Sequence, residues 1–242
     1  MLKLNCDMGE SYGVWQMGDD KAIFPYIDMA NLACGFHASD PNHINTSVLL
    51  AAHYNVDIGA HVSYYDLQGF GRRSIKCSYE EIKSKVIYQL GALFGFTKVH
   101  KTQIKYVKPH GALYNDMMQD LHIFEAIVDA ISSFDANLKL MILSTSNTSS
   151  HETIATKYNI DLLYEVFADR NYTDDGFLVP RSKNNAVIHD INKVLERIQE
   201  IQNNSTLTSI NGNKLTIKAD TICVHSDTDG ALEYIKTLKQ HI

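Results

Sequence analysis

Short apolar runs alternate with helix-period segments along almost the whole of this 242-residue chain. Seven runs have the length and composition of buried strands, and most are followed by a segment whose apolar residues recur at helical spacing. The expected strands cover residues 2–6, 29–34, 56–60, 104–108, 139–143, 162–167 and 221–224. A strand–helix repeat of this kind predicts a parallel sheet with right-handed crossovers.

The segments between the strands carry signals that begin helices. Asp40 precedes Pro41, an N-cap followed by proline in the first turn, and Ser78 with Glu81 forms a capping box. The expected helices cover residues 41–54, 79–96, 121–134, 152–158, 186–202 and 230–238. Asn211-Gly212 predicts a hairpin within residues 208–218, as an excursion beside the last strand. Because no linker or fixed-period repeat interrupts the chain, we expect a single domain over residues 1–242.

Ionisable side chains follow six of the seven expected strands, whereas the loops from helix to strand show no such pattern. In strand order they are Asp7 and Glu10; His37 and Asp40; His61, Asp66, Arg72 and Arg73; Lys108 and His110, with Tyr114 and Asn115; Glu165, Asp169, Arg170 and Arg181; and His225 and Asp227. An open doubly wound sheet gathers its site at one switch point, but a barrel collects residues from many strand ends. The pattern therefore predicts an α/β fold with a (β/α) barrel of seven strands or a distorted eight.

Each of these residues also has a purely structural interpretation. Asp40 taken alone is better explained as an N-cap, and a single histidine often only satisfies hydrogen bonds. Glu165 and Asp169 could pair with Arg170 in a surface network. These structural interpretations would all have to hold independently at six strand ends on one side of the fold. The pattern as a whole therefore favours a binding or catalytic site at that end of the barrel.

Composition excludes several classes of function. The formal net charge of -6 and the lack of a basic run argue against nucleic-acid binding. The N-terminus has no signal-peptide core, and no stretch approaches the length of a membrane span. The four cysteines form no CxxC pair, which predicts a cytoplasmic protein with reduced cysteines. The sequence also lacks the GxxxxGK[ST], GxGxxG and GxSxG motifs.

Several sequence blocks together resemble one known family. They are LNCDMGE (4–10), NLACGFHASDP (31–41), GAHVSYYDLQGFGRR (59–73), VKPHGALYN (107–115), EVFADRNY (165–172), DGFLVPRS (175–182) and VHSDTDGA (224–231). In this order they resemble the LamB/YcsF family, which comprises the A subunits of 5-oxoprolinase. The resemblance implies a seven-stranded TIM-like barrel similar to the glycoside hydrolase/deacetylase fold. Ser39 and Ser226 stand where the family usually has glycine, and Val62 and Tyr65 where it has proline.

The resemblance also implies an activity and partners. The expected reaction is cleavage of 5-oxo-L-proline to L-glutamate, coupled to hydrolysis of ATP to ADP and phosphate. The resemblance implies that the chain works with 5-oxoprolinase subunits B and C on a small-molecule substrate, and it leaves open which subunit binds ATP. A homo-oligomer is compatible with the sequence.

We assign roles to the polar residues from their chemistry. Lys108, Arg72 and Arg170 would neutralise phosphate or a substrate carboxylate, because Lys and Arg bind such anions well. Asp7, Glu10 or Glu165 would be the general base, and His110 or His225 would protonate the departing nitrogen. His37 and His61 would orient the substrate or bind a divalent cation such as magnesium. The remaining expected substrate contacts are Asp40, Arg73, Tyr114, Asn115, Asp169, Arg181 and Asp227.

Two alternatives remain open at this point. Asp7, His37 and His61 could form an Asp-His-His metal site, which would suit a metal-dependent deacetylase of an N-acetylated sugar. A non-catalytic regulatory subunit would instead bind a small molecule without turnover.

Overall fold

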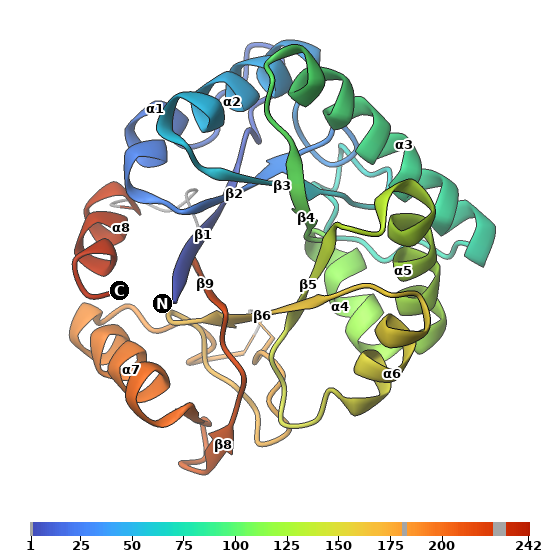
Figure 1. The fold of residues 1–242 in the computed structure, drawn as a ribbon. Helices are drawn as coiled ribbons and strands as arrows, with labels where there is room; N and C mark the ends of the chain where they lie inside the picture. The colour runs from blue at the N-terminus through green and yellow to red at the C-terminus, as the bar shows by residue number, and fades with distance from the viewer. Residues whose placement is uncertain (1, 181–182, 225–230) are drawn as a thin grey trace.

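Seven parallel strands close into a barrel in the computed structural model, which describes residues 2–180, 183–224 and 231–242 (Figure 1). The strands are β1 (Lys3–Met8), β2 (Met29–Ala33), β3 (Asp57–His61), β4 (Ile104–Val107), β5 (Lys139–Leu143), β6 (Leu162–Phe167) and β9 (Thr221–Val224). Each strand pairs with the next in this order, and β9 pairs with both β6 and β1, which closes the ring. The predicted parallel barrel is confirmed.

Most helices surround the barrel as an outer ring, whereas α4 lies inside this ring near β5 (Figure 1). The helices are α1 (Asp20–Ile23), the 3-10 helix η1 (Phe24–Tyr26), α2 (Pro41–Tyr54), α3 (Tyr79–Val99), α4 (Gly111–Gln119), α5 (Leu121–Asp135), α6 (Ser149–Lys157), α7 (Ile191–Asn204) and α8 (Ala231–Lys239). The Asp40 cap of α2 and the Ser78–Glu81 capping box of α3 are confirmed. Among the described residues, no helix combines the length and the apolar character needed to cross a membrane.

The structure differs from the predicted elements at three places. The short elements α1 and η1 and the helix α4 were not predicted, since each is brief and lacks a long apolar period. The helix predicted from residue 186 begins only at Ile191, because Asp190 accepts a hydrogen bond from Asn192 N and caps it there.

The predicted hairpin is present as β7 (Thr206–Thr208) and β8 (Lys214–Thr216), and Glu200 of α7 holds it through Thr208.

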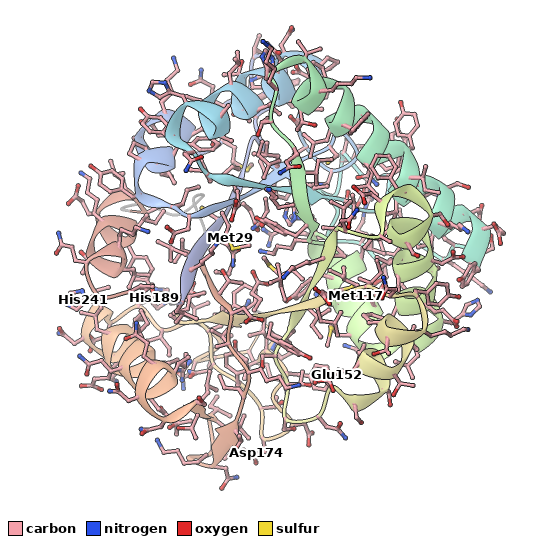
Figure 2. All side chains as sticks on the ribbon, in the orientation of Figure 1. Met29, Met117, Glu152, Asp174, His189 and His241 are labelled. Carbon is pink, nitrogen blue, oxygen red and sulfur yellow. The ribbon has the colours of Figure 1, made fainter. Side chains whose placement is uncertain are left out.

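Side chains of alternate strand residues face the inside of the barrel, as strand geometry requires. Met29, Tyr106 and Met141 form an apolar cluster there, and Leu163 packs against it. In Figure 2, Met29 lies near the middle of the barrel, whereas Asp174 and His241 lie at its periphery. The opposite faces of the strands, together with the helices, form the main hydrophobic core.

Polar side chains form the next layer of the barrel interior. Tyr106 Oη donates to Asn31 Oδ1 at 2.7 Å, and Asn31 Nδ2 donates to Asn5 Oδ1 at 2.8 Å. Asn5 Nδ2 donates in turn to Thr221 Oγ1 at 2.9 Å. Because a strand presents every second residue to one face, Asn5 is followed inside the barrel by Asp7, and Tyr106 by Lys108. The carboxyl ends of the strands therefore present charged groups above a hydrogen-bonded base.

Replacing Gly59 by alanine tests this interior packing. Gly59 lies opposite Tyr106 across β3 and β4, and an added Cβ would lie 2.1 Å from Tyr106 Cε2. We expect Gly59→Ala to lower the free energy of unfolding in urea by about 1–3 kcal/mol, because overpacking forces neighbours to move. Gly91→Ala in α3 is the control, since its Cβ meets nothing within 4 Å. That variant should gain about 0.5–1 kcal/mol, and similar effects at both sites would contradict this packing.

Candidate active site

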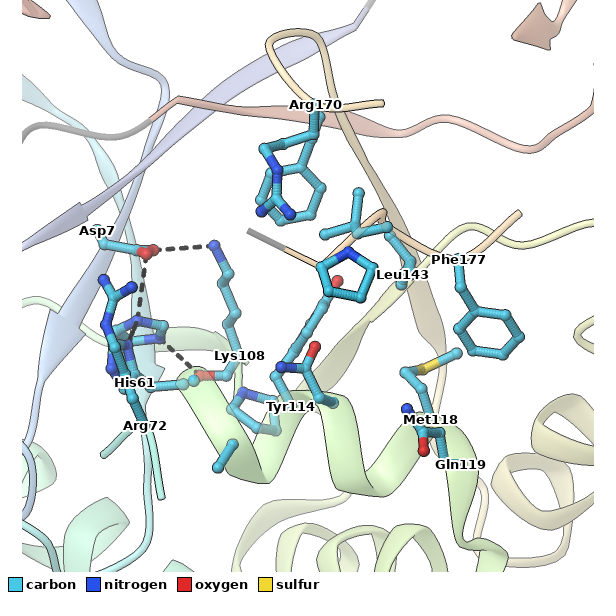
Figure 3. Close-up of a pocket in the computed structure, with 18 of the residues that line it drawn as sticks. Asp7, His61, Arg72, Lys108, Tyr114, Met118, Gln119, Leu143, Arg170 and Phe177 are labelled. Atoms are coloured by element: carbon cyan, nitrogen blue, oxygen red, sulfur yellow. Dashed lines mark hydrogen bonds and ion pairs between the residues drawn. The ribbon is translucent and has the colours of Figure 1, made fainter. Parts of the chain in front are cut away.

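A cavity of about 440 Å³ opens at the carboxyl ends of the strands, a size typical of small-molecule sites (Figure 3). One side is polar and the other is apolar. The polar lining includes Asp7, Glu10, His61, Arg72, Lys108 and His110, and the apolar lining includes Met118, Leu143, Phe167, Phe177, Leu178 and Pro180. The cavity can therefore hold a small ligand with one polar and one apolar side.

Lys108 is the buried cation at the base of the cavity. Its Nζ lies 2.9 Å from Asp7 Oδ1 and 2.9 Å from Glu165 Oε1. Burial alone would lower the pKa of Lys108, but the adjacent carboxylates raise this pKa well above its ordinary value. Tyr114 Oη donates to Glu165 Oε2 at 2.7 Å, which fixes that carboxylate. We call Asp7, Lys108 and Glu165 the charged floor of the cavity.

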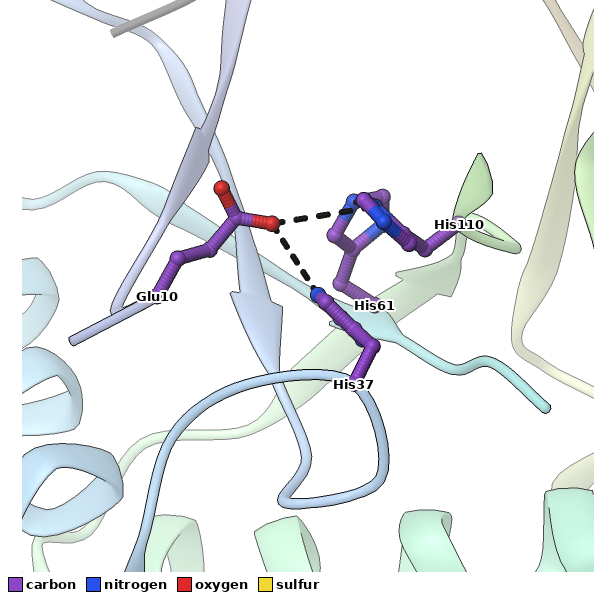
Figure 4. Close-up of side chains that lie close together, drawn as sticks. All are labelled: Glu10, His37, His61 and His110. Atoms are coloured by element: carbon purple, nitrogen blue, oxygen red, sulfur yellow. Dashed lines mark hydrogen bonds and ion pairs between the residues drawn. The ribbon is translucent and has the colours of Figure 1, made fainter. Parts of the chain in front are cut away.

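Glu10, His37, His61 and His110 form a second buried group beside the charged floor (Figure 4). Glu10 Oε1 lies 3.0 Å from His37 Nε2 and 3.6 Å from His110 Nδ1. Burial, reinforced by the neighbouring histidines, lowers the pKa of His37 and of His110 well below the ordinary value of histidine. One nitrogen or oxygen from each of the four side chains lies within 4.8 Å of the others. This His/Glu cluster could hold a divalent metal ion.

The glycine-rich loop after β3 packs directly on the His/Glu cluster. Gly71 has φ 63°, and a Cβ there would lie 2.8 Å from both His110 Cδ2 and His37 Cβ. Phe70 O accepts a hydrogen bond from His110 Nε2 at 2.9 Å, and Gly71 O accepts one from Ala112 N at 2.9 Å. Only glycine combines this backbone conformation with so close an approach to the two histidines.

Comparison with known proteins agrees with this geometry. The family model described as the LamB/YcsF family matches residues 2–242. The chain belongs to the LamB/YcsF family. It is 47% identical over 241 residues to a Vibrio campbellii protein named as the A subunit of 5-oxoprolinase, an alignment that covers 100% of this chain and 95% of the relative. It is 45% identical over 238 residues to a Pseudomonas aeruginosa protein named as 5-oxoprolinase A subunit 3, covering 98% of this chain and 95% of that relative.

A solved structure of the same shape is also known. The crystal structure of the lactam utilization protein from Thermus thermophilus matches with a TM-score of 0.92 and 37% sequence identity. The match covers 99% of this chain and 95% of that one. The fold of this chain is therefore shared with a protein whose structure was solved by experiment.

The structure brings most of the predicted site residues of this LamB/YcsF member to one place. Those that line the cavity are Asp7, Glu10, His61, Arg72, Lys108, His110, Tyr114, Asn115 and Arg170. Glu165 and His37 stand directly behind this lining, through their contacts with Lys108 and Glu10. Arg181, His225 and Asp227 lie outside the described residues.

Three predicted substrate contacts have structural partners instead of a place in the cavity lining. The Asp40 carboxylate accepts hydrogen bonds from Asn42 N and His43 N and so caps α2. Arg73 pairs with Asp66. Asp169 accepts from Ile188 N through its backbone oxygen at 2.7 Å. The bland interpretation of Asp40 therefore describes its contacts better than the functional one.

The predicted metal set also differs from the observed cluster. Asp7, His37 and His61 were expected, but Glu10 and His110 complete the group around the two histidines. Asp7 stands next to it, with Oδ2 at 3.4 Å from His61 Nε2, and pairs with Lys108 through Oδ1. Asp7 therefore connects the charged floor to the His/Glu cluster.

Sequence reasoning missed the residues that support the charged floor from below. Asn31 Nδ2 donates to Asp7 Oδ1 at 2.7 Å, and Cys223 Sγ lies 3.3 Å from Lys108 Nζ. The apolar run around Cys223 predicts only a small buried hydrophobe, yet this side chain contacts the central ammonium. Strand alternation was the signal that could have indicated these residues. It places Asn5 on the same interior face as Asp7, two residues later, and Cys223 pairs with Asn5 in the sheet.

Ser39 offers a test of the family comparison. It has φ 74° where the family usually has glycine, it is fully buried, and its Oγ has no hydrogen-bond partner among the described residues. Ser39→Gly should raise the free energy of unfolding by about 1–2 kcal/mol, because it removes backbone strain and an unsatisfied hydroxyl. Asn55→Gly is the control, since Asn55 also has positive φ but is a residue type that tolerates it. Equal gains, or a loss at Ser39, would contradict this interpretation.

Asp20 supports the turn that presents Glu10, and its titration can be measured. Its Oδ2 accepts a hydrogen bond from Gly9 N at 3.0 Å, and burial raises the pKa of Asp20 to about 6. Because this folded pKa lies above the ordinary value, the carboxyl stabilises the fold fully below about pH 4 and loses this contribution as pH rises toward 6.

The expected loss is up to about 3 kcal/mol between pH 4 and 6. Asp20→Asn should remove it, so the difference in unfolding free energy between variant and parent should change with pH across this window. Asp161→Asn is the control, because the Asp161 side chain is 83% exposed. Identical pH profiles for the parent and Asp20→Asn would show that Asp20 does not titrate in this way.

Proposed function

We propose that this chain is the A subunit of an ATP-dependent 5-oxoprolinase, which opens 5-oxo-L-proline to L-glutamate together with subunits B and C. The observation that carries the proposal is the charged floor of a small cavity, in a chain similar over its full length to proteins named as the A subunit of 5-oxoprolinase. The name of the Thermus relative, a lactam utilization protein, supports the same substrate class, because 5-oxoproline is a lactam.

The chemistry of the proposed substrate gives ATP a role in the proposed reaction. A five-membered lactam is a resonance-stabilised amide, so water attacks it slowly near neutral pH. Phosphorylation of the amide oxygen makes the carbon electrophilic and converts that oxygen into a leaving group. The proposal places ATP hydrolysis in the assembled enzyme and gives this chain the task of holding the ring and its developing charge.

The cavity matches such a substrate on both of its sides. The ring carbons would lie against Phe167 and Phe177, and Arg72 would bind the substrate carboxylate. Lys108 would stabilise negative charge on the lactam or phosphoryl oxygen, because a fixed buried ammonium needs no reorganisation as charge develops. Asp7, which faces both Lys108 and His61, is positioned to accept a proton from water.

A metal-dependent deacetylase is the second candidate, and the His/Glu cluster is the observation that favours it. Such an enzyme would release acetate from an N-acetylated sugar without ATP or partner subunits. A non-catalytic regulatory subunit would bind ligand and show no turnover even when subunits B and C are present.

Reconstitution distinguishes these candidates. The chain would be purified together with subunits B and C, and 5-oxoproline-dependent ATP hydrolysis would be measured with each component omitted in turn. The proposal predicts glutamate and ADP only from the complete mixture. Acetate release by the chain alone, or ATP hydrolysis that ignores 5-oxoproline, would contradict it.

Within this assay, Asp7→Asn should lower kcat by at least about 100-fold, the usual contribution of a general base. Asparagine keeps the size of the side chain and can still accept from Lys108. Asp57→Asn is the matched control, because Asp57 begins β3 at the opposite end of the barrel and pairs with exposed Lys3. Normal turnover by Asp7→Asn would refute the role of Asp7.

A further inference from the structure

The hydrogen bonds on the far sides of the histidine rings define their tautomers. His61 Nδ1 lies 2.8 Å from Lys108 O, and His110 Nε2 lies 2.9 Å from Phe70 O. A carbonyl oxygen can only accept, so both of these nitrogens carry hydrogen. In the neutral ring the other nitrogen then has a lone pair, which places lone pairs on His61 Nε2 and His110 Nδ1.

The tautomer of His37 depends on the hydroxyl group of Ser63. Ser63 Oγ lies 2.8 Å from Tyr64 O and 3.1 Å from His37 Nδ1. When the single hydroxyl hydrogen points to Tyr64 O, which can only accept, Ser63 Oγ accepts from His37 Nδ1. The lone pair of His37 therefore lies on Nε2. Three histidines from separate strand ends thus turn lone pairs toward one point, and each is oriented by an outer hydrogen bond, as metal-binding histidines usually are.

These tautomers bring acceptors together at hydrogen-bond distances. His61 Nε2 lies 2.9 Å from His110 Nδ1, and His37 Nε2 lies 3.0 Å from Glu10 Oε1. When all three rings are neutral with these tautomers, no hydrogen lies between His61 Nε2 and His110 Nδ1, or between His37 Nε2 and Glu10 Oε1. In each pair, two lone pairs then face each other. Asp7 Oδ2, 3.4 Å from His61 Nε2, adds a third such contact.

Extra protons are a poor solution to this conflict. Satisfying both close contacts would require two protons and hence two imidazolium rings in a buried cluster. The rings of His37 and His110 stack with centroids 3.8 Å apart and planes 5° apart, and His61 lies edge-on to both. Two like charges at this distance in a buried site repel each other, and the carboxylates of Glu10 and Asp7 would have to offset both this repulsion and the loss of hydration. One cation at the convergence point removes every conflict at once.

We propose that His37, His61, His110 and Glu10 bind one divalent first-row transition-metal ion, with zinc as the reference ion. Ligands about 2.1 Å from a tetrahedral ion lie about 3.4 Å apart, and the four donor atoms here lie within 4.8 Å of one another. Three imidazole nitrogens favour zinc and its neighbours, because magnesium and calcium prefer oxygen ligands. The proposed ion is therefore distinct from the magnesium that accompanies ATP.

The position of the ion gives it a function in the cavity. Glu10, His61 and His110 all line the cavity, so a bound ion could polarise a carbonyl oxygen or lower the pKa of a bound water. That consequence rests on the proposed function, whereas the metal site itself does not depend on the substrate.

The test measures metal directly. The full chain would be stripped with a chelator, dialysed, and titrated with zinc and separately with cobalt(II), whose visible absorption reports its coordination. We expect about one ion per chain. Glu10→Gln and His110→Gln should abolish stoichiometric binding, with circular dichroism confirming that both variants remain folded.

Two further variants separate a metal site from a merely structural histidine cluster. Ser63→Ala removes the partner of His37 Nδ1 without removing a ligand, and it should weaken metal affinity by about 10–100-fold. His43→Ala is the matched control, because His43 lies on α2 outside the cluster, and it should leave affinity unchanged.

The outcomes distinguish this proposal from the proposed function. Absence of zinc and cobalt binding by the folded parent chain, or full binding by Glu10→Gln and His110→Gln, would overturn the metal site. Metal binding without 5-oxoproline turnover in the reconstituted enzyme would support the site and reject the proposed function. Turnover by a chain that binds neither ion would do the reverse.

Discussion

The buried ammonium of Lys108 is the interaction on which the rest of the site depends. A charge removed from water is costly unless opposite charges meet it at short range. Here the carboxylates come from β1 and β6, which are not neighbours, and β9 lies between them with Cys223 against the same ammonium. The closure of the ring at seven strands brings Asp7 and Glu165 within reach of one Nζ. The fold and the site are therefore parts of one arrangement.

The polar groups divide into two units that share Asp7. Its Oδ1 contacts Lys108 and its Oδ2 faces His61. A change of charge in the His/Glu cluster therefore changes the electrostatic energy of the charged floor, and the reverse also holds. The charged floor is suited to stabilise negative charge, while the His/Glu cluster is suited to bind a cation. These two units lie side by side, opposite the apolar side of the cavity, where the proposed cyclic amide substrate would bind.

Much of the fold could be predicted from the sequence. Strands and long helices were predictable because strand and helix periods are local properties, and the barrel because ionisable groups follow the strands on one side only. The helix α4 was missed, since it is short and begins at Gly111 with a left-handed φ of 55°. Capping by Asp190, which shortens α7, competes with apolar periodicity and is hard to weigh in advance.

The sequence predicted which residues belong to the site better than it predicted which of them contact one another. Strand-end position identified Lys108, Glu165 and His110, but not which carboxylate meets which cation. Glu10 reaches His37 because Gly9 adopts φ 71° and its N–H donates a hydrogen bond to Asp20. No local sequence pattern predicts that turn. Asp40 shows that a residue at a strand end can also cap the next helix, because its carboxylate accepts from Asn42 N and His43 N.

Two carboxylates hold Lys108 as a buried ammonium. The most direct measurement is an NMR pH titration of the Lys108 side chain, with its signal assigned by comparison with a Lys108→Arg variant. We expect the pKa of Lys108 to lie well above its ordinary value, so that the ammonium persists at pH values where exposed lysines, with a pKa of about 10.4, lose their protons. A Lys108 that titrates with the exposed lysines, or below them, would contradict the account.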